Sequence, residues 1–322
     1  MTKIVSVDTD YEKNDVEAAM AEEAGVEYAV FHDPSPEGII KNARDADGVL
    51  TAYGEFTEEV FAALAPKLKV VSRCGVGYDT VDIEAATKYG VAVCNVPGYA
   101  TEVVSDHAIA LTLAVLRRIN EVDADMRKGT WDYARHRPLG QVKGRTFGVV
   151  GMGHIGTAAA KKARGLGFEV VCCSHSLEPG STTPDGFKVL SFDDLLKQAD
   201  VVSFHTALTE DNRHMLDGTR LALMKKDAIV VNTARGALID TVALAQALEA
   251  GVLWGAGIDV FEEEPLPADH PLFKAPNTVL SPHDAYWSEE SGAELRQRSM
   301  QHAIDGALGK RPANCLNPSV FS

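Results

Sequence analysis

A single glycine-rich stretch constrains the fold of this chain more than any other feature of its sequence. The apolar run Thr146–Val150 has the composition of a short buried strand, and residues 157–164 are rich in helix-forming residues. Between them stand three glycines in a GxGxxG pattern at positions 151–156. A strand, a glycine turn and a helix in this order bind a diphosphate, because backbone N–H groups and the helix dipole attract its negative charge.

The three glycines have different expected roles in this predicted dinucleotide site. Gly151 permits the tight turn, Gly153 lets the backbone approach the phosphates, and Gly156 lets the helix pack closely on the strand. The predicted cofactor contacts of this turn are Gly151, Gly153, His154, Ile155 and Gly156.

The residues after the next expected strand bear on which nucleotide is bound. A carboxylate about twenty residues after the glycines would bind the ribose 2′-hydroxyl and repel a 2′-phosphate. Here the strand at 169–173 is followed by Ser174 and His175, and neither carries a carboxylate. This pair fits a site that admits NADP, although no Arg follows to bind the phosphate. A relaxed NAD site is the alternative, so the predicted cofactor is NADP or NAD.

Strands and helices are expected to alternate along the whole chain. Strands are expected at residues 3–7, 27–31, 48–51, 69–72 and 91–93, and then at 146–151, 169–173, 201–204, 228–232, 255–259 and 278–280. The expected helices include 15–24, 57–64, 81–89, 102–118, one that begins after Asp240 and stops at Gly251, and a last one at 289–308. Such alternation predicts the α/β class, with parallel sheets covered on both faces.

The length of 322 residues favours two domains. The first strand–helix run is complete before the glycine motif begins, so we expect one domain of residues 1–99 and 289–322 and a second of residues 100–288. The last helix would then return to the first domain. The helix at 102–118 is apolar on most of its circumference, so we expect it to be buried between domains or between the subunits of a homodimer.

Charge and composition exclude several classes of function. A net charge of −15 argues against a surface for nucleic acid or an anionic membrane. Residues 1–20 lack the pattern of a signal peptide and no segment is apolar for long enough to span a bilayer, so we expect a cytoplasmic protein. The five cysteines contain no CxxC pair, as expected for free thiols in a reducing compartment. No His, Cys and Asp residues have the spacing of metal ligands, so we predict no metal.

Ligands of open parallel sheets bind outside the carboxyl ends of the strands, so the residues that follow the expected strands are the candidate site residues. In the first domain these are Tyr53, Arg73, Val76 and Gly77. In the second domain they are Ser174, His175, His205, Thr206, Thr233, Ala234, Arg235, Asp259, Glu264 and His283.

Several of these residues lie in blocks that resemble a known family. The blocks NTARG at 232–236, GIDVFEEEP at 257–265 and SPH at 281–283 look like the signatures of the D-isomer-specific 2-hydroxyacid dehydrogenases. Four further blocks, at 73–79, 94–97, 151–156 and 205–214, agree in type and order, so the resemblance covers nearly the whole chain. Residues 283–291 are also similar to the branch that contains the C-terminal binding proteins and their bacterial relatives.

The resemblance implies a flavodoxin-like substrate domain (the catalytic domain) and a Rossmann dinucleotide-binding domain, with the active site in the cleft between them. It implies an NAD(P)-dependent D-2-hydroxyacid dehydrogenase, or 2-keto-acid reductase, in which the nicotinamide supplies a hydride. His283, oriented by Glu264, would donate a proton, because imidazole titrates near working pH. Arg235 would bind the substrate carboxylate through its planar fork, which a Lys does not have.

The resemblance implies the remaining contacts as well. The substrate would touch Tyr53, Arg73, Tyr286 and the backbone amides of Val76 and Gly77. Asp259 would accept a hydrogen bond from the nicotinamide carboxamide. Further cofactor contacts would come from His205, Thr206, Thr233 and Ala234, in addition to the glycine turn, Ser174 and His175.

Each residue assigned a catalytic role could instead have a purely structural one. Arg235 would fit a surface ion pair, His283 a hydrogen-bonded core histidine, and Glu264 one acid of the solvated run at 262–264. Glu264 is preferred over Glu263 because it directly precedes a proline, as in the family block. His107, His205 and His214 fit structural or cofactor-adjacent positions better than catalytic ones.

Three positions depart from the family pattern. Ser174 stands where Asp is usual, Asp284 follows His283 where Ala or Gly is usual, and Tyr286-Trp287 reverses the expected aromatic order. Two alternative functions are therefore kept beside the reductase. One is a cofactor-sensing dimeric binding protein, and the other is a dehydrogenase of another small anion, such as formate or phosphite.

Overall fold

The computed structural model describes residues 1–322, and contacts between residues divide the chain into two units. The first unit contains residues 1–99 and 288–322, and the second contains residues 100–287. Both ends of the chain therefore belong to the first unit. The second segment of that unit begins one residue earlier than the sequence suggests.

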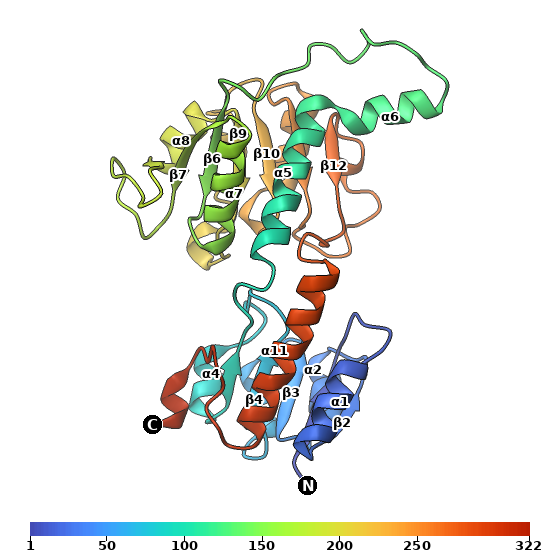
Figure 1. Ribbon diagram of the computed structural model, residues 1–322, viewed down its shortest axis with the longest axis vertical. Coiled ribbons are helices and arrows are strands. Elements are labelled where there is room, and N and C mark those ends of the chain that lie inside the picture. Colours follow the sequence, from blue (N-terminus) through green and yellow to red (C-terminus); the bar gives the residue numbers. More distant parts are fainter. The chain divides into compact units, whose positions relative to one another are not determined.

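The first unit is a five-stranded parallel sheet covered by helices on both faces (Figure 1). Its strands are β1 (Lys3–Ser6), β2 (Glu27–Val30), β3 (Gly48–Thr51), β4 (Val70–Arg73) and β5 (Ala92–Cys94). Its helices are α1 (Asp15–Ala24), α2 (Pro36–Asn42), α3 (Glu58–Leu64), α4 (Ile83–Lys88) and α11 (Glu289–Ala307), with a short 3-10 helix, η4 (Pro318–Phe321). The strand order β2-β1-β3-β4-β5 is that of flavodoxin-like folds, so the chain reverses direction across the sheet between β1 and β3.

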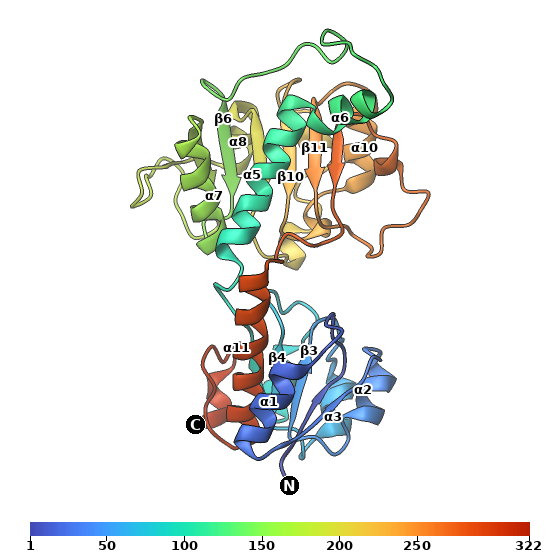
Figure 2. The same cartoon turned by 45° about the vertical axis from the view of Figure 1, so that its right-hand side comes forward.

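Helix α11 joins this sheet although more than 180 residues separate it from β5. It packs on β1, β3, β4 and β5 beside α1, as Figures 1 and 2 show. Gly306 permits the close approach, because a Cβ atom there would lie 2.5 Å from the Cβ of Val70. Ser72 donates a hydrogen bond to the backbone oxygen of Ser299 at 2.9 Å. Met300, Ala303 and Ile304 are buried in the core of this face.

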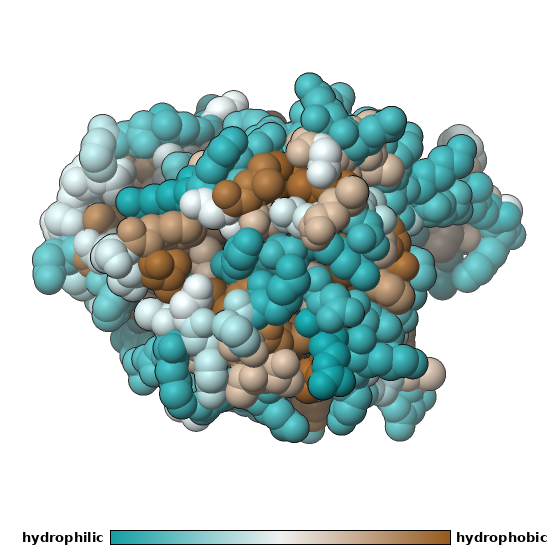
Figure 3. All heavy atoms as spheres, turned by 90° about the horizontal axis from the view of Figure 1, so that it is seen from below, coloured by the Kyte–Doolittle hydropathy of each residue, from teal (hydrophilic) through white to brown (hydrophobic).

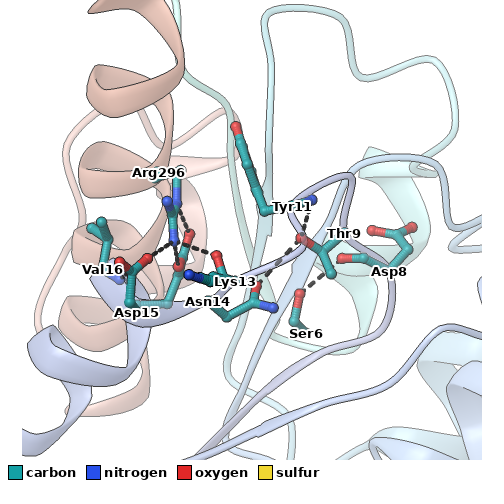
Figure 4. Close-up of polar contacts among 10 residues, drawn as sticks. Ser6, Asp8, Thr9, Tyr11, Lys13, Asn14, Asp15, Val16 and Arg296 are labelled. Carbon is teal, nitrogen blue, oxygen red and sulfur yellow. Dashed lines mark hydrogen bonds and ion pairs between the residues drawn. The ribbon is translucent and has the colours of Figure 1, made fainter. Parts of the chain in front are cut away.

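A buried ion pair fixes α11 to the start of α1 (Figure 4). The guanidinium of Arg296 donates to both carboxylate oxygens of Glu17, at 2.9 and 2.6 Å, and to Asp15 at 2.9 Å. It also donates to the backbone oxygen of Lys13 and lies 4.7 Å from the ring centroid of Tyr11. Glu17 is 5% exposed, so removal of Arg296 would leave a buried charge without its partner.

The second unit is a seven-stranded parallel sheet in the order β12-β11-β10-β9-β6-β7-β8. Its strands are β6 (Thr146–Val150), β7 (Glu169–Cys173), β8 (Lys188–Val189), β9 (Val201–Phe204), β10 (Ile229–Asn232), β11 (Gly255–Ile258) and β12 (Thr278–Leu280). Its helices are α5 (Thr101–Arg117), α6 (Ile119–Arg127), α7 (His154–Gly165), α8 (Phe192–Gln198), α9 (Gly218–Leu221) and α10 (Thr241–Glu249), with 3-10 helices η1 (Glu210–Asn212), η2 (Gly236–Leu238) and η3 (Pro271–Phe273). This is the doubly wound Rossmann order with one added strand, and the direction reverses between β6 and β9.

Helix α5 is buried mainly by its own unit. It packs on α7 and on β10, β11 and β12, and Ala108, Leu111 and Val115 belong to a core cluster of the second unit. Gly257 of β11 allows the contact, since a Cβ atom there would lie 2.7 Å from the Cβ of Leu111. The apolar circumference of this helix therefore needs no partner subunit to explain it.

None of the helices is both long and apolar enough to cross a membrane. On the face of the molecule seen in Figure 3, hydrophobic residues form separate groups within a largely hydrophilic surface.

Candidate active site

The glycine turn after β6 has the geometry that a bound diphosphate requires. Gly151 has φ +96°, and a Cβ atom there would lie 2.7 Å from the backbone oxygen of His205. A Cβ atom at Gly156 would lie 1.9 Å from the oxygen of Gly151, so α7 and the turn pack too closely for any side chain. A Cβ atom at Gly153 would meet nothing within 4 Å. The open side of the turn therefore faces a space that phosphates can enter.

Helix α7 presents its free N–H groups to the same space. It begins at His154, and its N-cap residue Gly153 makes no side-chain hydrogen bond. The first N–H groups of a helix have no partner within the helix and attract an anion. His154 is exposed and Ile155 is half-buried at this end. The turn and the helix together fit the diphosphate of a dinucleotide.

His205 and Thr206 follow β9 on the other side of the point where the strand order reverses. The backbone N–H of His205 donates to Val150 at 2.7 Å, and its Nε2 lies 2.8 Å from the hydroxyl of Ser203. Its Nδ1 is buried and makes no hydrogen bond. Burial lowers the pKa of His205 to about 4, so the ring is neutral at pH 7.

We expect His205 to make the folded protein sensitive to acid. In the unfolded chain its pKa is near 6.5, so between pH 6.5 and 4 the unfolded chain binds a proton that the folded chain does not. Stability therefore falls as the pH falls through this window, by about 2–3 kcal/mol at pH 4. Melting temperatures measured from pH 7 to pH 4.5 should fall less in His205→Gln than in the wild type. The exposed His32→Gln serves as the control, and equal slopes in all three proteins would contradict this account.

Ser174 and His175 lie directly after β7. The hydroxyl of Ser174 is 3.3 Å from that of Ser176, and His175 is exposed. These hydroxyl and imidazole groups provide hydrogen bonds at the end of the second strand of a Rossmann sheet, where a ribose binds. No carboxylate occurs among the three residues.

Arg235 lies in the turn that follows β10, and hydrogen bonds of Asn232 fix the conformation of this turn. Asn232 donates to the backbone oxygen of Arg235 at 2.8 Å and accepts from the N–H of Ala234 at 3.0 Å. The guanidinium of Arg235 donates to the oxygen of Ala234 at 2.9 Å. A Cβ atom at Gly236 would lie 1.9 Å from the carbonyl carbon of Phe261, so a glycine is needed for the two loops to meet. The hydroxyl of Thr233, beside Ala234, is buried and has no hydrogen bond.

Glu264 and His283 form a hydrogen-bonded pair. Glu264 Oε2 lies 2.6 Å from His283 Nδ1, and its Oε1 accepts from the N–H of Phe261 at 2.8 Å. Burial by itself would raise the pKa of Glu264, but these hydrogen bonds and the charge of Arg235 hold it below its ordinary value. The Nδ1 proton of His283 is thus directed at a carboxylate, which leaves Nε2 for a reacting group.

The backbone also holds His283 in an uncommon conformation. Its φ is +56°, a left-handed value that non-glycine residues seldom adopt. Its N–H donates to the backbone oxygen of Asp259 at 2.7 Å. The ring of Tyr286 stands at 85° to that of His283, with the centroids 6.2 Å apart.

The acidic run before Pro265 divides into three environments. Glu262 accepts hydrogen bonds from the N–H and hydroxyl of Thr241 and pairs with His214, so it ties loops together. Glu263 is exposed. Glu264 alone of the three pairs with His283. Glu264, which the sequence favours over Glu263, is thus the residue of the run that contacts His283.

Asp259 lies fully buried at the end of β11. Its carboxylate accepts from the hydroxyl of Ser281 at 2.6 Å and from the N–H groups of Asp284 and Ala285 at 3.1 and 3.2 Å. Burial raises the pKa of Asp259 above its ordinary value, although these hydrogen bonds act in the opposite direction. His107 Nε2 lies 2.9 Å from the hydroxyl oxygen of Ser281. Because this hydroxyl donates its own hydrogen bond to Asp259, the oxygen accepts from His107, and Nε2 is the donor.

Sequence reasoning missed the role of Ser281 and placed His107 only as structural or cofactor-adjacent. Potential metal-ligand atoms of His107, Asp259 and Asp284 lie within 4.8 Å of one another. The oxygens of Asp259 already accept three hydrogen bonds, so we assign this cluster to the support of Asp259. The absence of a metal stays a prediction. The family block SPH at 281–283 contains Ser281 and could have indicated it, whereas nothing in the sequence relates His107 to Ser281, 174 positions away.

The candidate substrate residues of the first unit lie at the carboxyl ends of β3 and β4. Tyr53 is 50% exposed and its hydroxyl donates to Asp10 at 2.7 Å. Arg73 donates to the oxygen of Cys74 at 3.1 Å, and a Cβ atom at Gly75 would lie 1.5 Å from its guanidinium nitrogen. The guanidinium therefore lies over the Gly75 backbone, and its buried Nε makes no hydrogen bond.

Val76 and Gly77 continue this loop beyond Gly75. The side-chain amide of Asn95 donates to the oxygen of Val76 at 2.6 Å, and the N–H of Val96 donates to Gly75 at 2.8 Å. The structure thus gathers the candidates of each unit at the carboxyl edge of that unit's own sheet.

Comparisons with known proteins find chains that are similar over nearly the whole length of this one. Residues 109–285 match the family model described as D-isomer specific 2-hydroxyacid dehydrogenase, NAD binding domain. A glyoxylate reductase of Thermococcus litoralis is 39% identical over 305 residues, which cover 92% of each chain. The crystal structure of a glyoxylate reductase from Paecilomyes thermophila is 28% identical, with a TM-score of 0.88 over 99% of each chain. An acyclic imino acid reductase, solved with NADPH and D-Arg, has 27% identity and a TM-score of 0.88 over 98% of this chain and 100% of its own.

Proposed function

Because this chain belongs to the D-isomer-specific 2-hydroxyacid dehydrogenase family, and is thus an oxidoreductase of 2-hydroxy acids, we propose that it reduces a 2-keto acid to the D-2-hydroxy acid. The hydrogen bond between Glu264 and His283 is the observation that carries the proposal. A histidine with one ring nitrogen hydrogen-bonded to an ionised carboxylate is suited to donate a proton from the other nitrogen. The loop of Arg235 meets the loop of Phe261 at Gly236, and the charge of Arg235 helps to lower the pKa of Glu264, which supports the assignment of all three groups to one site.

Each residue has a proposed task. The reduced nicotinamide, when bound, supplies the hydride. His283 would give its Nε2 proton to the keto oxygen, and Glu264 would stabilise the charged ring before that transfer. Arg235 would bind the substrate carboxylate and polarise the keto group. Asp259 would accept from the nicotinamide carboxamide.

The proposed substrate is a small 2-keto acid, with glyoxylate the first candidate, since the relative from Thermococcus litoralis is a glyoxylate reductase. Tyr53, Arg73 and the amides of Val76 and Gly77 are the proposed substrate contacts of the first unit. Tyr286 is the proposed contact of the second unit, because its ring stands against that of His283.

Absorbance at 340 nm tests this function. Purified protein is mixed with NADH or NADPH and with glyoxylate, pyruvate, hydroxypyruvate or a branched 2-keto acid, and loss of absorbance is followed. We expect turnover with at least one acid and a D-configured product by chiral chromatography. Binding of the cofactor without turnover of any acid would reject the reductase and favour the cofactor-sensing function.

For the cofactor we propose that the site admits NADP as well as NAD. Ser174 and His175 provide hydrogen-bond donors without a carboxylate at the end of β7. A 2′-phosphate is doubly charged, and a carboxylate at this point would repel it. The acyclic imino acid reductase of the same fold was solved with NADPH.

Replacing Ser174 by Asp should move the cofactor preference toward NADH. We expect the ratio of kcat/KM for NADPH to that for NADH to fall by about 100-fold, because like charges brought together cost several kcal/mol. Ser174→Asn is the matched control, because an Asn side chain has nearly the same shape as Asp but no charge. It should change the ratio by about threefold at most. An unchanged ratio in Ser174→Asp would show that the ribose does not lie beside this residue.

We also propose that the chain forms a homodimer through α6 and residues 128–139. Helix α6 buries none of its residues, and Ile119, Val122 and Met126 are exposed along it. The next segment exposes Trp131 by 83% and Tyr133 by 79%. Both extend from the edge of the second unit in Figures 1 and 2.

A second copy is the proposed occupant because of the area involved. An aromatic side chain buries about 150–250 Å². Two copies would bury four such rings, and the aliphatic residues of α6 bring the total to the roughly 1,200 Å² at which stable interfaces begin. The double variant Trp131→Ser/Tyr133→Ser should therefore be monomeric by light scattering, whereas Phe273→Ser, at another exposed apolar position, should leave the dimer intact. A wild-type monomer would reject the dimer, and a dimer only with cofactor would support the sensing function.

A further inference from the structure

Two loops of the first unit flank the point where its strand order reverses. Residues 8–14 follow β1 and residues 52–54 follow β3, and β1 and β3 are neighbours in the sheet. In open α/β sheets the crevice at this point is where ligands bind. Tyr53, a proposed substrate contact, stands in the second loop.

The carboxylate of Asp8 holds the whole of the 52–54 loop. Asp8 is 7% exposed, and its Oδ2 accepts from the Thr51 hydroxyl at 3.0 Å and from the N–H groups of Tyr53 and Gly54 at 2.9 and 2.8 Å. Its Oδ1 accepts from the N–H of Ala52 at 2.5 Å. Three successive N–H groups thus converge on one side chain, so the path of this loop depends on a residue more than forty positions earlier in the chain.

The loop at 8–14 is itself firmly held. The Ser6 hydroxyl donates to the backbone oxygen of Asp8 at 2.8 Å, and the Thr9 oxygen accepts from the N–H of Tyr11 at 3.1 Å (Figure 4). The ring of Tyr11 lies under the guanidinium of Arg296, which also binds the Lys13 carbonyl. Asp8 therefore presents its carboxylate from a rigid support.

The same loop holds the other end of Tyr53. The Tyr53 hydroxyl donates to Asp10 at 2.7 Å, while its backbone N–H donates to Asp8. The backbone and the ring of Tyr53 are thus both fixed from residues 8–10. Because both its backbone N–H and its hydroxyl are hydrogen-bonded, the Tyr53 ring is held in one orientation. A fixed orientation of this kind favours substrate binding.

We propose that Asp8 is a positioning residue that sets the affinity of the enzyme for its 2-keto acid through Tyr53. This inference rests on the proposed function, since it assigns Tyr53 to the substrate. Asp8 takes no part in hydride or proton transfer, so its loss acts on KM and leaves kcat largely intact. An amide at this position keeps the shape but offers one acceptor oxygen in place of two, so the four donors cannot all be satisfied.

The variant Asp8→Asn tests the proposal, and Asp47→Asn is its matched control. Asp47 is also buried and belongs to the same sheet, but it precedes β3, at the opposite end of that strand from Tyr53. It accepts from the N–H of Lys3 and pairs with Lys67 and Lys69. We expect Asp8→Asn to raise the KM for the keto acid by about tenfold or more, to change kcat by about threefold at most and to leave the KM for the cofactor unchanged. Asp47→Asn should lower the melting temperature without a change in KM.

Combination with Tyr53→Ala shows whether Asp8 acts through Tyr53. In that background Asp8→Asn should raise the KM further by about twofold at most, because contacting residues in one network are not additive. Independent, multiplying effects would overturn the proposal, as would an unchanged KM in Asp8→Asn. If Asp8→Asn does not fold, Tyr53→Phe replaces it: loss of the hydroxyl bond to Asp10 should raise the KM with little change in kcat, and an unchanged KM there would reject the fixed orientation. A wild type without keto-acid turnover would instead reject the proposed function itself.

Discussion

Arg235→Ala is expected to lower kcat/KM for the keto acid by about 10³-fold or more, equivalent to about 4 kcal/mol of transition-state stabilisation. The guanidinium is the one charged group that we assign to the substrate carboxylate in the second unit, and it also polarises the keto oxygen as negative charge develops there. Its turn is held by Asn232 and Gly236, so the Ala variant should keep the loop and lose only the charge. Steady-state kinetics with the best keto acid measures the effect.

Three companion measurements separate this loss from general damage. Fluorescence titration should show nearly unchanged binding of NADPH, because the glycine turn of residues 151–156 follows β6, whereas Arg235 follows β10. Arg235→Lys should recover only part of the rate, since an ammonium cannot bind a carboxylate in two places. Arg213→Ala, an exposed arginine 4.0 Å from Glu262, should behave as the wild type. If Arg235→Ala kept most of the activity, the assignment of this residue to the substrate would be wrong.

Glu264→Gln is expected to lower kcat by about 10²–10³-fold, within the range that general acid–base groups contribute. The carboxylate sits 2.6 Å from His283 Nδ1 and its pKa is held below the ordinary value, so it stays ionised at working pH. A Gln amide has almost the same shape but carries no charge to stabilise the protonated ring. It can also turn its NH₂ group toward Nδ1 and fix the wrong tautomer.

Glu263→Gln is the matched control for this variant. It makes the same chemical change at the adjacent, exposed position, and its kcat should lie within about twofold of the wild type. The KM for the cofactor should stay constant in both variants. Equal losses of kcat in Glu263→Gln and Glu264→Gln would show that the acidic run acts through its summed charge and that no specific pair with His283 operates.

Much of the fold was predictable because local rules set it. The expected roles of Gly151 and Gly156 follow from their spacing between a strand and a helix, and the structure shows close contacts that exclude a side chain at each. Helix α1 ends at Gly25, with φ +69°, and α10 begins after Asp240, whose side chain accepts from the N–H of Ala243. In each case the signal and the structure that it determines lie within a few residues of each other.

Other features could not be predicted because their partners are distant in sequence. Nothing local marks Asp8 as the acceptor of three N–H groups more than forty residues away. His107 and Ser281 meet across 174 positions. Helix α6 was missed because none of its residues is buried, so no pattern of core positions marks it. The sequence predicts that helix α5 is buried but not what covers it. The covering elements belong to its own unit, and hydrophobic periodicity does not indicate which strands lie next to a helix.

The return of α11 to the first unit has a consequence for biosynthesis. Residues 100–287 are contiguous, so the nucleotide-binding unit can complete its core as soon as it leaves the ribosome. The first unit has to wait, because Glu17 meets Arg296 only after 279 further residues have been added. Until then one face of its sheet lacks the helix that buries Ile4, Leu50 and Val70. The part of the chain that is synthesised first is thus the part that matures last.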